Sequence, residues 1–231
     1  IDVSARPQPP AILTVTGTTI ADNLAGDPAR VSLNEGSGGG IFNSSGRLLL
    51  TNSTLTGNEA VPSYASGFGF IAGTGRGGGL GHQMLLGDDP NDGTTVVNST
   101  IAYNTGFTGS QIYGFTTVEP MLLANTLIAG GAGATPNCAS EGAGVGLESL
   151  GGNLSSDASP CFFDETGDQP NVAPGIDSAL ADNGGPTDTI ALLESSNAIG
   201  AGLPAYCPPD DQRGSLRPSP CSVGAVDVPE P

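Results

Sequence analysis

The sequence predicts an all-β protein in which short units stack along one axis as a parallel solenoid. The first observation is an internal repeat, in which four stretches superimpose without gaps. The second is that Asn or Gly recurs at the same two places in each copy. The third is the composition, since 37 Gly, 19 Pro and no Trp among 231 residues indicate a turn-rich backbone around a core of small apolar side chains. One copy is too short to bury its own apolar residues, whereas stacked copies can do so.

The four copies begin at Val15, Leu50, Val96 and Leu123, and read VTGTTIADN, LTNSTLTGN, VVNSTIAYN and LANTLIAGG. Their first and sixth positions are always apolar, which predicts ladders of buried side chains along the axis. Their third and ninth positions are always Asn or Gly. Because these residues adopt positive φ most easily, we expect the chain to turn at both positions. We also expect the Asn side chains to bond to their equivalents in the next copy or to the backbone of the turns.

Other elements follow from what lies between the copies. The stretches GGGIF from Gly38 and GGGLG from Gly77 predict further strands, and we expect insertions to loop out at 27–36, 61–76 and 87–93. A β-sandwich would also give short strands, but it predicts alternating segments at a spacing of about 8–12 residues. We therefore expect coils over 1–136, further coils with a disulfide-bonded C-terminal cap over 137–226, and a linker at 227–231. A cap is expected because an open end exposes unpaired strand edges.

The charge of the chain narrows the classes of partner. Six Arg, no Lys and 23 acidic residues give a formal net charge of −17. Nucleic acid is excluded, because phosphate binding requires clustered cations. Neutral glycans, cations and basic proteins are compatible with this charge, although acidity also serves solubility alone. The chain has no apolar stretch of about 20 residues, so no transmembrane segment is predicted in it.

Four cysteines fall in two local pairs, Cys138 with Cys161 and Cys207 with Cys221. The absence of a Cys-x-x-Cys spacing and the single histidine argue against a zinc site. We therefore predict two disulfides and an oxidising, extracellular compartment. Near the second pair, we expect Asp211 to pair with Arg213 or Arg217.

Several stretches carry a resemblance to known proteins. GGGIFNSSGRLLLTNSTLTGN, from Gly38, resembles the repeat of right-handed parallel β-helix proteins. SLGGNLSSDASPCFF, LADNGGPTDTIALLESSNAIGAG, DQRGSLRP and CSVGAVDVPEP resemble, in that order, the bacterial surface-protein family of choice-of-anchor Q domain proteins. The match runs from Gly38 onward, and residues 1–37 fit it less well. The resemblance implies a right-handed parallel β-helix that is secreted or attached to the cell surface, and it implies no particular catalytic mechanism.

The stretch Val228 to Pro231 resembles the opening of the PEP-CTERM sorting signal, in which the motif precedes an apolar membrane helix and a basic tail. This resemblance implies a bacterial surface protein anchored through a C-terminal segment that is later removed. Two prolines in four residues are also typical of an ordinary extended linker. We expect the gene either to encode about 20 further apolar residues ending in arginines, or to encode a freely secreted product.

Two kinds of polar motif are candidate sites. The loop GDDPNDG brings Asp88, Asp89, Asn91 and Asp92 together, and these oxygen ligands could hold Ca²⁺, although the spacing lacks the pattern of an EF-hand and an exposed acidic turn is the preferred interpretation. No other cofactor is indicated. Of the Asn-x-Ser/Thr sequons, those at Asn52 and Asn98 coincide with turn positions of the repeat. Asn43 and Asn153 are therefore the glycan acceptors that we predict, if the chain is glycosylated.

The remaining candidates concern ligand binding and catalysis. The inserted loop 61–76 carries Tyr64, Phe68 and Phe70, which could stack on a sugar or contact a protein, or else pack on the loop's own coil. His82 has no visible catalytic partner and is interpreted as a surface or turn residue. Arg76 is the single basic candidate for a lyase.

Three functions follow. The first is a non-catalytic secreted or cell-surface stalk or adhesin that presents its loops to a glycan or a partner protein. The second is a polysaccharide lyase or hydrolase of the β-helix type, for which the repeats carry few acidic residues. The third is a subunit that self-associates into extracellular filaments, which the acidic surface and the expected cap oppose.

Overall fold

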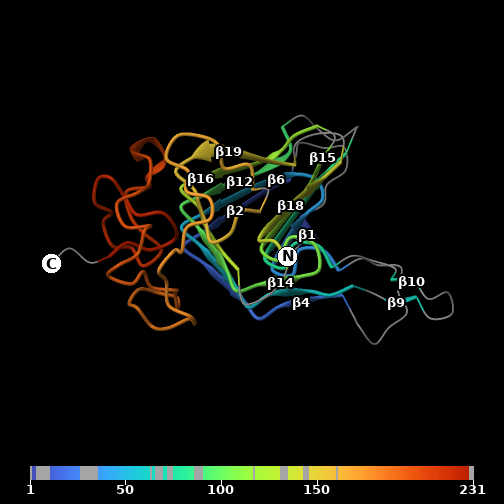
Figure 1. The fold of residues 1–231 in the computed structure, drawn as a ribbon, viewed down its shortest axis with the longest axis horizontal. Helices are drawn as coiled ribbons and strands as arrows, with labels where there is room; N and C mark the ends of the chain where they lie inside the picture. Colours follow the sequence, from blue (N-terminus) through green and yellow to red (C-terminus); the bar gives the residue numbers. More distant parts are fainter. Residues whose placement is uncertain are drawn as a thin grey trace.

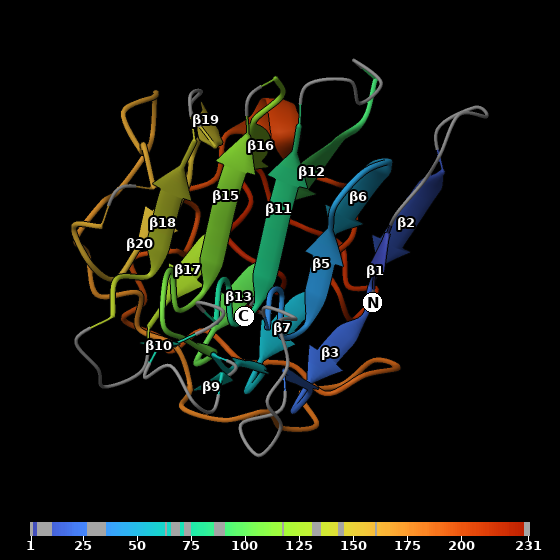
Figure 2. The same ribbon diagram turned by 90° about the vertical axis from the view of Figure 1, so that its right-hand side faces the viewer.

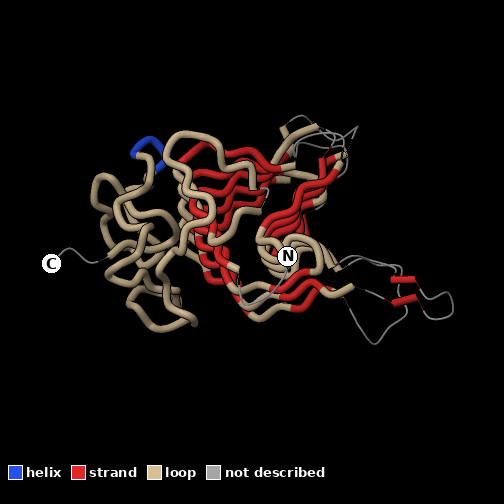
Figure 3. Tube along the Cα trace, viewed as in Figure 1, coloured by secondary structure: helices blue, strands red, loops and turns tan. Residues whose placement is uncertain are grey.

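The computed structural model describes residues 2–3, 11–26, 36–62, 64–65, 70–71, 75–85, 91–116, 118–130, 135–142, 146–159 and 161–228. Within these residues the regular structure is β-strand, apart from one 3-10 turn at Pro204–Tyr206. Figure 3 shows that the strands are gathered in one half of the molecule and that the C-terminal part is built from loops and turns. The prediction of an all-β protein is confirmed.

Most strands belong to four parallel sheets. We name them sheets A to D. Sheet A is the one that faces the viewer in Figure 2. Its strands are β1 (Asp2–Val3), β5 (Ile41–Asn43), β11 (Leu80–Met84), β15 (Ile112–Thr116) and β18 (Cys138–Glu141). Sheet B contains β2 (Ile12–Thr16), β6 (Arg47–Thr51), β12 (Gly93–Val97), β16 (Met121–Ala124) and β19 (Leu147–Gly151).

The other two parallel sheets are made of shorter strands. Sheet C contains β3 (Thr19–Ala21), β7 (Thr54–Thr56), β13 (Thr100–Ala102), β17 (Leu127–Ala129) and β20 (Leu154–Ser155). Sheet D contains β4 (Leu24–Ala25), β8 (Glu59–Ala60) and β14 (Thr105–Gly106). A separate antiparallel pair joins β9 (Tyr64–Ala65) to β10 (Phe70–Ile71). Each passage of the chain through sheets A, B and C, in that order, is called a row, and neighbouring strands of a sheet come from successive rows. Sheet D has strands from the first three rows among the described residues.

The pairing register agrees with the repeat residue by residue. The first positions of the copies face one another across sheet B, as Val15 with Leu50, Leu50 with Val96, and Val96 with Leu123. The sixth positions do the same across sheet C, as Ile20 with Leu55, Leu55 with Ile101, and Ile101 with Ile128. The ladders expected from the sequence are therefore present.

The structure adds a fifth row that the ungapped comparison did not find. In this row β19 pairs with β16, and β20 pairs with β17. The register shifts between Leu123 and Ala124, whose partners are Ser149 and Gly151. One extra residue in β19 is enough to hide this row from a comparison without gaps.

The interior between the sheets is a single apolar cluster. It contains the first-position and sixth-position ladders together with the inward residues of sheet A, among them Ile41, Leu80 and Ile112, which are fully buried. Aliphatic side chains dominate this core, as the low aromatic content predicts. The first row is less covered, because Val15 and Ile20 keep 8% and 9% of their surface exposed whereas the equivalent Leu50 and Leu55 keep none.

The two predicted turns differ in how well their positions agree with the observed backbone φ angles. At the third position the prediction is confirmed, with φ of +59° at Gly17, +47° at Asn52, +42° at Asn98 and +47° at Asn125. For the second turn, the predicted ninth position is one residue too late. Positive φ falls on the eighth position, at Asp22, Gly57 and Tyr103.

The Asn residues at the ninth position form hydrogen bonds between rows rather than turn the chain. Asn58 Nδ2 donates to Asn104 Oδ1 at 2.9 Å, and Asn23 Nδ2 donates to Asn58 Oδ1 at 2.9 Å. The same Oδ1 atoms also accept backbone N–H groups of the preceding row. The fourth copy has Gly at this position, and the side chain of Gln111 takes the place of the missing Asn by accepting from Asn104 Nδ2 at 2.9 Å. The Asn side chains therefore bond to their equivalents, as the repeat predicts.

Residues 161–172 cover the end of the sheets beyond the fifth row. Gln169 forms a parallel bridge to Leu154, and Val172 N donates to Ser155 O at 3.0 Å. Phe163 is 8% exposed and closes the interior cluster. The disulfide between Cys138 and Cys161 ties this segment to β18.

Residues 173–228, which we call the C-terminal segment, do not cap the end of the sheets, as the sequence led us to expect, but lie along their side. Figure 1 places this orange and red segment opposite the strands of sheet A. Its Ile190, Ala198 and Val223 pack with Leu127 and Ala129 in a second apolar cluster. Ile128 between them belongs to the interior cluster, since adjacent side chains of a strand point to opposite faces. Sheet C is therefore buried on both faces where this segment covers it.

The C-terminal segment is held by its own disulfide and by the third-position Asn residues. Cys207 pairs with Cys221, so both predicted disulfides are present. Disulfides of this kind are typical of an oxidising compartment. The side-chain amides then anchor the segment: Asn52, Asn98 and Asn125 donate to the carbonyls of Asp210, Ser222 and Leu203 at 2.6, 3.0 and 3.0 Å. Among the described residues there is no helix long and apolar enough to cross a membrane.

Candidate functional site: a pocket at the start of sheet B

The predicted aromatic site falls largely outside the described residues. Phe68 is not described, and Tyr64 and Phe70 are described only as backbone of β9 and β10, where Phe70 pairs with Ala65 and Tyr64 with Ile71. Figure 1 shows these two strands apart from the parallel sheets. Sugar stacking by this loop stays a prediction.

The predicted metal loop is described only in part. Asp88 and Asp89 lie outside the described residues, whereas Asn91 is exposed and Asp92 is buried directly before β12. In the described ranges no three His, Cys, Asp or Glu side chains form a group that could hold a metal ion. Because two of the four predicted oxygen ligands lie outside the described residues, this metal site stays a prediction.

Both predicted glycan acceptors are wrong. Asn43 and Asn153 are fully buried. Asn43 Nδ2 donates to Gly93 O and to Thr94 Oγ1 at 3.2 and 2.9 Å, and Asn153 Nδ2 donates to Leu123 O at 3.0 Å. Because the glycan would have to be attached to that nitrogen, the folded protein has no room for it at either residue.

The interpretation of His82 as a surface or turn residue is also wrong. His82 is fully buried in β11, beside Asn43 of β5. Asn43 donates to Thr94 Oγ1, so the Thr94 hydroxyl donates in turn to His82 Nδ1 at 3.0 Å, and His82 Nε2–H donates to Glu119 O at 2.9 Å. Burial lowers the pKa of His82 to about 4, although the bond to Glu119 O acts in the opposite direction. The imidazole is neutral at pH 7 and sealed from solvent, so it is a structural residue.

A small pocket opens above this buried network, where β6, β12 and β16 begin. We call it the corner pocket, and its volume is about 230 Å³. Charged side chains of Arg47, Asp92 and Glu119 line it, together with Asn91, and Thr95 and Leu122 form its base. Thr95 and Leu122 face each other on adjacent strands. The base is thus part of the outer face of sheet B.

The two carboxylates of the corner pocket occupy equivalent places in adjacent rows. Thr94 pairs with Met121, and counting back two residues sets Asp92 level with Glu119. Both residues line the corner pocket. Like charges directly opposite each other on adjacent strands destabilise a sheet. The sequence comparison missed this pair because both residues lie four positions before the first residue of their copies.

The charges of the corner pocket are not balanced by one another. Asp92 is 8% exposed, and its Oδ1 is buried without a hydrogen-bond partner in the part of the chain that the structure describes. Arg47 pairs with Gly93 through the backbone of β6, but no ion pair joins its side chain to either carboxylate in that same part of the chain. A buried carboxylate without a donor is costly. The arrangement therefore favours a ligand that brings donors or positive charge.

The other charged candidates are engaged elsewhere. Arg76, the predicted lyase residue, stacks over the ring of Tyr113 at 5.1 Å and pairs with Glu141 at 3.5 Å, and it does not line the corner pocket. Asp211 pairs with Arg213 at 2.6 Å, as expected from the sequence, and Arg217 pairs with Asp227. Burial raises the pKa of Asp211, but the hydrogen bonds and charge of Arg213 and the N–H of Asp227 outweigh it and hold that pKa below its ordinary value.

Two larger cavities of about 570 and 580 Å³ lie along the C-terminal segment. Their charged linings include Asp211, Arg213, Arg217 and Asp227, which are already paired with one another. These cavities offer a ligand fewer unsatisfied groups than the corner pocket does.

Comparison with known proteins does not assign the chain to a group. No protein-family model matches it, and it has no significant similarity to a curated protein or to a solved structure. The function is therefore inferred from the pocket itself.

Proposed function

We propose that the chain is a right-handed parallel β-helix that acts outside the cell. Successive rows that pair in parallel across three five-stranded sheets, in the same register through the four copies of the repeat, support a helical coil. Connections between parallel strands of one sheet are almost always right-handed, which supports the hand. The two disulfides support an oxidising compartment. Attachment to a bacterial surface through a C-terminal anchor belongs to this proposal through the resemblance of the sequence alone.

Within that setting, we propose a non-catalytic binding protein that holds a glycan in the corner pocket. The observation that carries the proposal is the arrangement of Arg47, Asp92 and Glu119 around the base formed by Thr95 and Leu122. Carboxylates accept and guanidinium groups donate hydrogen bonds to hydroxyls, while the partly apolar base suits the C–H face of a sugar ring. A volume of about 230 Å³ suits one sugar unit of a longer chain.

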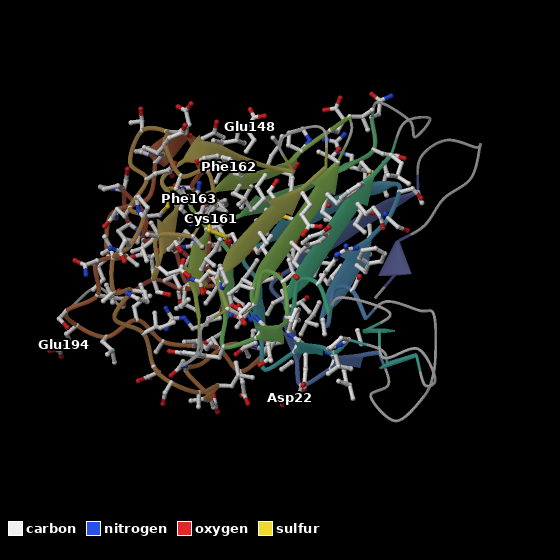
Figure 4. All side chains as sticks on the ribbon, turned by 45° about the vertical axis from the view of Figure 1, so that its right-hand side comes forward. Asp22, Glu148, Cys161, Phe162, Phe163 and Glu194 are labelled. Carbon is white, nitrogen blue, oxygen red and sulfur yellow. A yellow bond between two sulfur atoms is a disulfide. The ribbon has the colours of Figure 1, made fainter. Side chains whose placement is uncertain are left out.

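A glycan array tests the proposal. We expect the wild type to bind a subset of neutral glycans, and the variants Arg47→Ala and Glu119→Gln to lose at least about tenfold in affinity, the effect of one or two hydrogen bonds to charged groups. Glu194→Gln is the matched control, because Glu194 is exposed on the C-terminal segment. Glu148 pairs with Leu122, which lines the pocket. Figure 4 shows Glu194 far from Glu148, so Glu194 is remote from the corner pocket. Silence of the wild type across the array, or equal binding by all variants, would contradict the proposal.

A glycoside hydrolase is the second candidate, and the level placement of Asp92 and Glu119 favours it. Hydrolases use two carboxyl groups flanking one glycosidic bond. Incubation with xylans, pectins and alginates would decide between the two, since a hydrolase releases reducing ends and loses this activity in Glu119→Gln. A lyase would release unsaturated products instead.

A further inference from the structure

The corner pocket holds two acidic residues and one basic residue, Arg47, whose side chain forms no ion pair with either carboxylate among the described residues. Asp92 and Glu119 both line the pocket, and Asp92 Oδ1 is buried with no hydrogen-bond partner among the residues that are described. Nearly all buried polar atoms of a folded protein have a partner, so an atom without one points to a ligand, an ion or a water. Two carboxylates that line one small pocket also repel each other unless a cation lies between them.

A second unsatisfied acceptor lies on the other side of Gly93, outside the lining of the corner pocket. Asn43 is fully buried, and its amide orientation is fixed because Nδ2 donates to two carbonyl oxygens, Gly46 O and Gly93 O. Its Oδ1 therefore points the other way and has no partner within the described ranges. Asn43 does not line the corner pocket, so among the described residues Asp92 supplies the unsatisfied acceptor there.

We propose that the corner pocket binds a divalent cation, Ca²⁺, bridged by the carboxylates of Asp92 and Glu119 and completed by water. Ca²⁺ takes hard oxygen ligands and tolerates irregular geometry. Softer metals prefer thiolate or imidazole, and all four cysteines are in disulfides while His82 is sealed beneath the pocket. This inference concerns the same pocket as the proposed function, but it does not depend on glycan binding, because cation binding is measured without a glycan.

The test is a thermal unfolding series on the whole chain in EDTA and with increasing CaCl₂, with isothermal titration calorimetry on the same samples. At a hundredfold excess over Kd, Ca²⁺ should raise the Tm of the wild type and of Glu194→Gln by about 5 °C or more. Asp92→Asn should lose this rise. In EDTA the same variant should be at least as stable as the wild type, because a buried carboxylate without a donor has been removed.

Glu119→Gln is a second test of the cation site. Glu119 is half-buried, and its substitution keeps the hydrogen bond from His82 Nε2–H to the backbone O of residue 119. It should weaken Ca²⁺ binding at least about tenfold without lowering Tm in EDTA. No shift of the wild-type Tm at millimolar Ca²⁺ would overturn the proposal, as would an equal shift in Asp92→Asn or an equal shift with Mg²⁺. Glycan binding that persists in EDTA, together with no Ca²⁺ binding, would overturn the cation and leave the proposed function standing.

Discussion

The rows of strands between Ile12 and Ser155 and the C-terminal segment at 173–228 are stabilised in opposite ways. In the strand rows each contact is repeated, since the same apolar position, the same Asn bond and the same backbone pairing recur from one row to the next. In the C-terminal segment few contacts repeat, and the segment depends on single buried groups. Arg217, for example, is 1% exposed and bonds Asp227, Asn52 and the carbonyls of Gly224 and Ala225.

This difference predicts how each region responds to damage. A defect in one row should be shared with its neighbours, because the stability of stacked repeats is close to a sum of local terms. A defect at a unique buried contact should release a whole segment. The four predictions below test this contrast, from the largest expected effect to the smallest.

Replacement of Arg217 should be the most damaging change. Arg217→Met leaves Asp227 buried at 1% exposure without its cation, which should cost about 3–5 kcal/mol in the free energy of unfolding. Urea denaturation measures the loss. Hydrogen exchange should locate it in the C-terminal segment, with the amides of sheet B still protected.

The matched control is Arg47→Met, which removes an exposed Arg that has no ion pair among the described residues. Its stability should stay close to that of the wild type. If Arg217→Met cost no more than Arg47→Met, the C-terminal segment would not depend on single contacts.

Acid should affect the two regions in separate pH ranges. In the strand rows the pKa of His82 is lowered from 6.5 to about 4 by burial, so the unfolded chain binds a proton in this range that the folded chain does not. Stability is therefore full above pH 6.5 and falls as pH drops toward 4, by about 3 kcal/mol in all. In the C-terminal segment the pKa of Asp211 is lowered below 3.8, so its contribution is lost only below that pH.

Equilibrium unfolding between pH 7 and pH 3 measures both effects. His82→Gln should flatten the curve between pH 6.5 and 4 and leave the lower range unchanged. If the pH dependence of the free energy of unfolding were unchanged in this variant, His82 would not be the cause of the loss between pH 6.5 and 4.

The Asn ladder should lose more from its middle than from its end. Asn104→Ala removes the Oδ1 acceptor of the backbone N–H and of the Nδ2 of buried Asn58, which should cost about 1–3 kcal/mol. Asn23 is exposed and lies in the first row, so Asn23→Ala should change stability by about 0.5 kcal/mol or less. Chemical denaturation of both variants checks the order. Equal losses would mean that the ladder does not act through burial.

The repeat predicted the strand rows well because one physical requirement recurs in them. Every row has to fill the same interior positions, and this left the pattern of Val15, Leu50, Val96 and Leu123 in the sequence. The fifth row was hidden by a single extra residue in β19. The position of the C-terminal segment could not be predicted, because the contacts of Arg217 to Asn52 and Asp227 span very different sequence separations and occur once.

The candidate site was predicted only through Asp92 and Asn91. Arg47 and Glu119 were missed because they lie before the copies rather than within them, although extending the alignment four residues upstream would have set Asp92 level with Glu119. The errors at Asn43, Asn153 and His82 have a common cause. All three are polar residues at inward positions, and only the structure shows the partners that allow their burial.

The smallest expected effect tests whether the third-position turn of the first row accepts Asn, as the equivalent turns of the other rows do. Gly17 has φ of +59°, and the equivalent Asn52, Asn98 and Asn125 hold φ between +42° and +47°. A Cβ at Gly17 would approach nothing closer than Gln212 O at 3.7 Å, so a side chain fits. Asn tolerates this backbone and restricts the unfolded chain more than Gly does, so Gly17→Asn should stabilise the protein by about 0.4–1 kcal/mol. Gly17→Val is the control, because a β-branched residue does not tolerate positive φ, and it should destabilise. A rise in Tm with Asn and a fall with Val would extend the rule to the first row, whereas a fall with both would mean that this turn is held by the C-terminal segment and not by the repeat.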